Sequence, residues 1–146
     1  MISNETQYRK TKGHLATFDE ALANLEARAG TGKRSKLAQL EIDAVRAQAD
    51  DLRAELAEYE KLRTGTVSFL EADSLAGLGA VLIRARLARG WTQRQLADAL
   101  GVAEQQIQRY ESTAYRSASL ARLCDVADAL SVTITERAKL DAPPAA

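Results

Sequence analysis

The sequence predicts a mainly α-helical protein, built as an N-terminal antiparallel helical hairpin followed by a bundle of short helices. The chain of 146 residues is rich in Ala, Leu, Glu, Arg and Gln, which favour helix, whereas aromatic residues make up only 5% of it. Apolar residues recur at helical spacing from residue 15 to residue 62. The later periodic segments are shorter, and glycines separate them. We therefore expect a hairpin at residues 1–64, a linker at 65–74 and a globular unit at 75–140.

The two helices of the hairpin are predicted from narrow apolar stripes. Between residues 15 and 29 the apolar side chains lie three and four positions apart, which is coiled-coil spacing. Gly30 and Gly32 then end the first helix. No Gly or Pro occurs between residues 36 and 62, so a second helix is expected there. The short connection predicts that the two helices lie antiparallel.

Each helix of this hairpin buries only one stripe, so apolar surface is left for another helix to cover. We expect a second copy of the chain to cover it, which makes the protein a homodimer. The residues expected at the dimer interface are Leu15, Phe18, Leu22, Val45, Leu52, Leu56 and Tyr59. The alternative is that the hairpin is an inert spacer with solvated, charged faces. Residues 1–64 carry 11 basic and 11 acidic residues, so their charge does not predict a nucleic-acid surface.

Two segments outside the helices have the alternation of short β-strands. Gly65 breaks the helical period, and Val67, Ser68 and Phe69 then alternate apolar and polar side chains at the start of residues 67–70. Residues 132–135 alternate in the same way, so we expect short strands at residues 67–70 and 132–135, paired with each other. The last six residues, 141–146, are expected to be a disordered tail.

Composition excludes several classes of protein. Lys and Arg together number 20, as do Asp and Glu, so no net charge attracts the whole molecule to nucleic acid or membrane. One His and one Cys are too few for a disulfide or a protein-built zinc site, and Cys124 is expected to be a small core residue. The chain shows no membrane span and no signal segment, so we expect a cytoplasmic protein without metal or cofactor. Because it also lacks a catalytic triad, a Walker loop and a dinucleotide fingerprint, we expect no enzymatic activity.

One segment of the second unit predicts the function. Thr92 and Gln95 have the spacing of a capping box, which fixes the start of a helix. Gly101 ends that helix, because glycine readily adopts the positive φ that a tight turn needs. A second short helix follows, with Ile107 on its inner face. This is the helix-turn-helix arrangement, in which the second helix enters the major groove of duplex DNA.

The outer face of that second helix suits base recognition, and the residues expected to contact bases are Glu104, Gln105, Gln108 and Arg109. Gln matches the donor and acceptor of adenine, Arg matches the two acceptors of guanine, and Glu could accept from the amino group of cytosine. Between residues 84 and 122 there are seven arginines and three acidic residues, so this region is positive although the whole chain is neutral. The alternative is that these are ordinary solvated side chains.

Residues 78–131 resemble the lambda-repressor-like, Cro/C1-type helix-turn-helix family, also called the XRE family. The resemblance rests on an Arg-rich first helix, Thr92-Gln93, Leu96-Ala97, Leu100-Gly101-Val102, Ile107, Glu111, Leu120, Ala127 and Leu130. It implies a five-helix bundle that binds DNA, with Gln93 at a phosphate and Glu104, Gln105 and Arg109 in base-reading positions. The residues expected at phosphates are Gln93, Arg94, Gln106, Arg84 and Arg116. The chain departs from the family at Ala103, where a capping Ser or Thr is usual, and in the loop after Glu111, which lacks the usual Gly and Pro.

Three functions stay open at this point. The first is a sequence-specific regulator of transcription that binds double-stranded DNA, in its simplest form a repressor. The second follows from the resemblance, since small XRE-type proteins with an extra segment resemble the antitoxins of type II toxin–antitoxin modules, which bind a toxin protein and repress their own operon. The third is a structural coiled-coil adaptor. We also expect residues 75–131 to bind DNA without residues 1–64, only more weakly.

Overall fold

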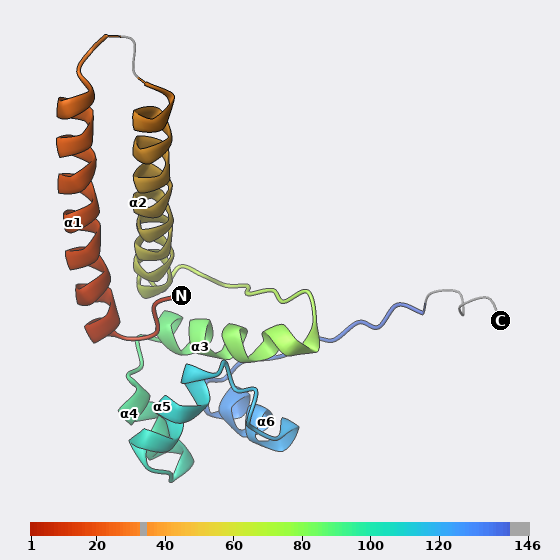
Figure 1. The fold of residues 1–146 in the computed structure, drawn as a ribbon. Helices are drawn as coiled ribbons and strands as arrows, with labels where there is room; N and C mark the ends of the chain where they lie inside the picture. Colours follow the sequence, from red (N-terminus) through yellow and green to blue (C-terminus); the bar gives the residue numbers. More distant parts are fainter. Residues whose placement is uncertain (33–34, 141–146) are drawn as a thin grey trace.

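The computed structural model describes residues 1–32 and 35–140, and this part of the chain is mainly helical, as predicted. Its elements are α1 (Glu5–Ala29), α2 (Lys36–Arg63), a 3-10 turn η1 (Leu75–Gly77), α3 (Leu78–Ala88), α4 (Gln93–Leu100), α5 (Glu104–Ser112) and α6 (Leu120–Ala129). Helices α1 and α2 form a long antiparallel hairpin, and the shorter helices gather at its base, beside the N-terminus (Figure 1). No helix in the described ranges is long and apolar enough to cross a membrane. The predicted tail at residues 141–146 lies outside the described residues.

The hairpin forms because each helix begins and ends at a residue suited to that position. The side chain of Asn4 accepts a hydrogen bond from the first turn of α1, and Gly30 ends this helix with a φ of 66°. Ser35 caps α2 in the same way. Between the two helices, Ile42 and Ala49 of α2 are 1% and 0% exposed, whereas α1 contains no fully buried residue.

Charged and aromatic side chains join the two helices of the hairpin. Arg46 donates to Glu26 at 2.7 Å, and Arg53 is paired with Asp19. Nearer the base, the rings of Tyr8 and Tyr59 stack with 4.9 Å between their centroids. These contacts bridge α1 and α2 but leave the charged groups partly exposed to water, where each ion pair contributes little stability.

The base of the hairpin and the C-terminal helices bury their apolar side chains in one continuous cluster, which we call the shared core. From residues 1–64 it contains Ile2, Leu56, Tyr59 and Leu62. From the C-terminal helices it contains Leu82, Ile83, Ala85, Leu87, Leu96, Ala97, Ile107, Tyr115, Val126, Ala127 and Leu130. An ion pair between Arg84 of α3 and Glu58 of α2, at 2.8 Å, lies at the same junction.

The loop between α5 and α6 passes very close to α3. A Cβ atom on Gly79 would lie 1.9 Å from the carbonyl oxygen of Ala114, so this position in α3 requires glycine. The loop itself turns through Ala114 and Tyr115, which both have positive φ, at 48° and 60°. The buried ring of Tyr115 stacks on Tyr110 at 5.7 Å, which anchors the strained loop without the Gly and Pro usual in the resembling family.

Three expectations from the sequence need correction or qualification. Residues 67–70 and 132–135 form no strand in the part of the chain that the structure describes, because Val67, Leu70 and Val132 pack singly against the shared core rather than along a partner strand. The bundle of five helical elements is complete only if the single turn η1 is counted, since no helix follows α6 up to residue 140. Cys124 is exposed and not in the core, because it lies on the outer face of α6.

Candidate nucleic-acid interface

Helices α4 and α5 are joined by a tight turn whose geometry follows from its sequence. The hydroxyl of Thr92 accepts from the backbone N–H of Gln95 at 3.1 Å, and the Gln95 side chain accepts from the Thr92 N–H at 2.8 Å, so the predicted capping box is confirmed. Gly101 ends α4 in the left-handed region with a φ of 65°. Leu96 and Ile107 are both 0% exposed and hold the two helices together from inside. The outer face of α5 is thereby left free.

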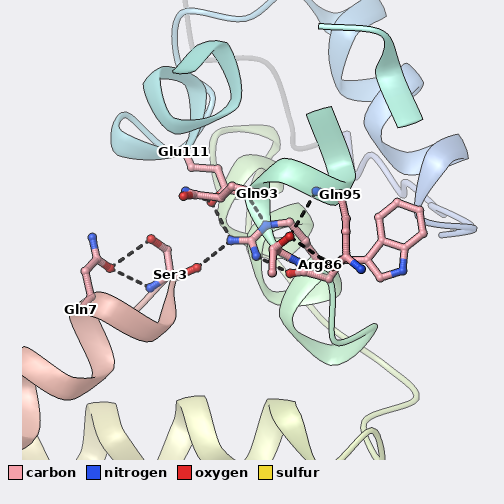
Figure 2. A network of polar contacts seen from close by, with 8 residues as sticks. Ser3, Gln7, Arg86, Gln93, Gln95 and Glu111 are labelled. Atoms are coloured by element: carbon pink, nitrogen blue, oxygen red, sulfur yellow. Dashed lines mark hydrogen bonds and ion pairs between the residues drawn. The ribbon is translucent and has the colours of Figure 1, made fainter. Parts of the chain in front are cut away.

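A buried ion pair fixes α5 to α3 (Figure 2). Arg86 of α3 donates from Nε and Nη2 to the two carboxylate oxygens of Glu111 on α5, at 2.6 and 2.7 Å. Both side chains are 1% exposed. A two-pronged contact of this kind is strong and directional, and burial makes the loss of either partner costly.

Two further bonds connect this ion pair to the start of α4. The Nη1 of Arg86 donates to the carbonyl oxygen of Trp91 at 2.6 Å, and the amide nitrogen of Gln93 donates to Glu111 at 2.8 Å. The guanidinium therefore holds α3, α4 and α5 in one mutual orientation. The face that α5 presents to solvent is set by buried contacts behind it.

The comparison with family models identifies this arrangement. The matching model is described as Helix-turn-helix and covers residues 82–137. Residues 82–137 are a helix-turn-helix domain. The domain is of the XRE type, which is found in DNA-binding regulators, and double-stranded DNA is the ligand that this supports. Comparisons with curated proteins and with solved structures found no match.

The residues predicted to read bases lie together on α5 of the helix-turn-helix domain. Glu104, Gln105, Gln108 and Arg109 are all exposed on this short helix. Gln108 donates to Glu104 at 3.3 Å, so these two side chains are already held side by side. Among the described residues no carboxylate is paired with Arg109, which leaves its guanidinium free to donate to a ligand.

The residues predicted at phosphates are not all gathered in one place. Arg94 and Arg116 are exposed, and no ion pair holds them within the described ranges, while Gln106 is half-buried. Gln93 is only 9% exposed and its amide nitrogen is bound to Glu111. Arg84 is paired with Glu58 of the hairpin. Their contacts with DNA stay predictions, and the positions of Arg94 and Arg116 favour them most.

The sequence did not single out Arg86, which looks like its neighbours Arg84 and Arg89. The only signal was spacing: two positions along a helix correspond to about 200° around it, so Arg84 and Arg86 must face opposite ways. The structure shows the result, with Arg84 against the hairpin and Arg86 against α5. The Glu111 that the resemblance marked is the partner of Arg86, not a surface residue.

The start of α5 differs from that of α4. Ala103 precedes α5 and supplies no side-chain hydrogen bond to its first turn. The N–H groups of this turn therefore have no side-chain cap, and they lie beside the exposed Glu104 and Gln105.

In the loop that follows α5, burial raises the pKa of Tyr115, so this phenol stays neutral where it packs near Glu111.

Proposed function

We propose that the protein is a sequence-specific transcriptional repressor that reads duplex DNA with α5 of its helix-turn-helix domain. The observation that carries the proposal is the buried contact of Arg86 with Glu111, because it aims Glu104, Gln105, Gln108 and Arg109 away from the core on one short helix. Arg109 then supplies paired donors for guanine, and the Gln side chains supply a donor and an acceptor for adenine. Arg94 and Arg116 are the proposed phosphate contacts.

We further propose that the repressor acts as a homodimer. One recognition helix covers only a half-site, and two helices about 34 Å apart can read two half-sites on one face of the duplex. Among the residues expected at the dimer interface, Leu15, Phe18, Leu22, Val45 and Leu52 are half-buried in the single chain and can lose more surface in a dimer. The other two, Leu56 and Tyr59, are 7% and 4% exposed and already belong to the shared core. The proposed interface is therefore the first set.

The test is to select binding duplexes from a random pool with the full chain and then to compare two arginine variants. Arg109→Ala should weaken the selected duplex by about 1–3 kcal/mol and relax the choice at one base pair. Arg94→Ala should weaken selected and random duplexes alike, and should lower the salt dependence of binding by the equivalent of one phosphate contact. Equal losses on both kinds of duplex for both variants would refute sequence reading by α5.

An antitoxin function is the second candidate, and the feature that favours it is the hairpin, which extends from the DNA-binding unit (Figure 1). An antitoxin would use this hairpin to bind a toxin protein while α5 represses the operon. The informative test is to co-express the chain with the product of the adjacent gene. Capture of that product by the full chain, and its loss on Phe18→Glu, would support the antitoxin. An adjacent product that is not captured would leave a repressor alone.

A further inference from the structure

The first residues of the chain return to the helix-turn-helix domain and touch the group that holds α5. Ile2 is 3% exposed and lies in the shared core. The carbonyl oxygen of Ser3 accepts a hydrogen bond from Nη2 of Arg86 at 2.6 Å (Figure 2). These residues are more than 80 positions away from Arg86 in sequence. No pattern in the sequence predicted that contact.

The position of Ser3 depends on the start of α1. Its N–H and its hydroxyl both donate to the side-chain oxygen of Gln7, at 2.8 and 3.0 Å, and the next residue, Asn4, caps the helix. The acceptor for Arg86 is a main-chain oxygen, so it moves with the backbone of the hairpin. Residues 2–3 therefore connect the base of the hairpin directly to Arg86.

The hydrogen bonds of Arg86 show what this connection does. Nε and Nη2 bind Glu111, Nη1 binds Trp91, and Nη2 also binds Ser3. Acceptors from three segments of the chain thus meet at one guanidinium, and the segment that carries Ser3 belongs to the hairpin. A buried guanidinium that loses an acceptor must find water, which opens the site around it.

We propose that Ile2 and Ser3 are positioning residues for DNA reading by α5. Ile2 anchors the N-terminal segment in the shared core, and the carbonyl of Ser3, next to it in the chain, completes the acceptors around Arg86. When the base of the hairpin moves, Glu111 is held less firmly and α5 spends less time in the orientation that fits DNA. The apparent affinity for DNA falls in proportion to the fraction of molecules in which α5 has that orientation. This inference rests on the proposed function, because it assigns the hairpin a part in how that site works.

The chain offers a matched pair of isoleucines for the test. Ile2 and Ile42 are 3% and 1% exposed, but only Ile2 belongs to the shared core. Ile42 is buried between α1 and α2, a place that we call the hairpin seam. Ile2→Ala and Ile42→Ala remove the same atoms. At a temperature where both variants are fully folded, Ile2→Ala should lower affinity for the selected duplex about five-fold or more, and Ile42→Ala less than about two-fold. Ile2→Val should restore most of the loss, and Ser3→Ala should have little effect because the main-chain acceptor is kept.

Hydrogen exchange tests the same inference without DNA. In the free protein, the amides of residues 107–112 should exchange about five-fold or more faster in Ile2→Ala than in Ile42→Ala, after correction for global unfolding. By reciprocity, the selected duplex should slow exchange at residues 2–8 of the wild type. Equal exchange of α5 in the two variants, or equal losses of affinity, would overturn the positioning role. If the wild type selects no duplex, the proposed function fails and the role in DNA reading fails with it, whereas the exchange of α5 still shows whether Ile2 holds that helix in place.

Discussion

The hairpin and the helix-turn-helix domain use the same kinds of contact with different results. Helix α1 runs for 25 residues without a fully buried side chain, whereas α3 buries most of its 11 residues. In the hairpin the ion pair of Arg46 and Glu26 has side chains 43% and 39% exposed. In the helix-turn-helix domain, Arg86 and Glu111 are 1% exposed. Water weakens the first pair, and burial makes the second one decisive for the orientation of α5.

The comparison also shows that the two regions are separate in pattern but not in packing. The hairpin seam around Ile42 belongs to residues 1–64 alone, whereas Ile2, Leu56 and Leu62 complete the core of the helix-turn-helix domain. The base of the hairpin therefore packs as part of the helix-turn-helix domain. The distal end of the hairpin contributes no residue to the shared core.

The largest expected effect comes from cutting the chain at residue 65. A fragment of residues 65–146 lacks Ile2, Leu56, Tyr59 and Leu62, and each buried apolar side chain of this size contributes about 1.5–3 kcal/mol. Their sum is comparable to the whole stability of a small domain. The shared core thus predicts a largely unfolded fragment, opposite to the independence that we expected from the sequence, and circular dichroism with urea measures it.

A shortened hairpin is the control for that fragment. Removing equal lengths from the distal ends of α1 and α2 keeps all four of these side chains, so the helix-turn-helix domain should stay folded and bind the selected duplex. A stable, DNA-binding 65–146 fragment would show that the domain boundary predicted at residue 64 is also a boundary of folding.

The second effect tests the buried ion pair against an exposed one. Glu111→Gln leaves the guanidinium of Arg86 buried without a counter-charge, and should lower the free energy of unfolding by about 3–5 kcal/mol. Glu26→Gln makes the same change at the exposed pair with Arg46 and should cost less than about 1 kcal/mol. Urea titrations of both variants give the two values. Similar losses would mean that the Arg86 site is more hydrated than its burial indicates.

The sequence predicted local features well where one or two residues determine them. The capping box at Thr92 and the turns at Gly30 and Gly101 were predicted because a cap or a positive φ is encoded within a few positions. The strand predicted at residues 67–70 failed because alternation describes only the segment itself, and a strand also needs a neighbour. In the structure Val67 and Leu70 reach the shared core while Phe69 is 89% exposed.

Long-range contacts could not be predicted from the chain alone. Cys124 lies next to an apolar stripe, so its exposure depends on how α6 is rotated, which only packing decides. The same holds for the N-terminal segment, because a main-chain oxygen such as that of Ser3 leaves no trace in the sequence. The exposed face of α5 was predictable, since the inner position of Ile107 fixes which side chains point outward.

The third effect concerns the half-buried side chains of the hairpin and the proposed dimer. Leu52→Lys places a charge among the half-buried side chains of the proposed interface, and should give a monomer with about ten-fold lower affinity for a two-half-site duplex. Leu37 is the matched control, because it is 75% exposed on the same helix and Leu37→Lys should leave the dimer intact. Light scattering and duplex titration measure both. A monomer from Leu37→Lys alone would move the interface to the outer face of α2.

The smallest effect concerns the starts of the helices α4 and α5. Helix α4 begins with the Thr92 capping box, whereas Ala103 gives α5 no side-chain cap. Thr92→Ala should lower the free energy of unfolding by about 1 kcal/mol, and Ala103→Ser should raise it by about 0.5–1 kcal/mol, because Ala103 already has the extended backbone that a cap requires. Urea titration measures both changes. The new hydroxyl would also bind an N–H group at the start of α5, so Ala103→Ser tests whether the selected duplex uses that group. A more stable protein with weaker DNA binding would indicate that it does, and unchanged binding would indicate that this N–H group does not contact DNA.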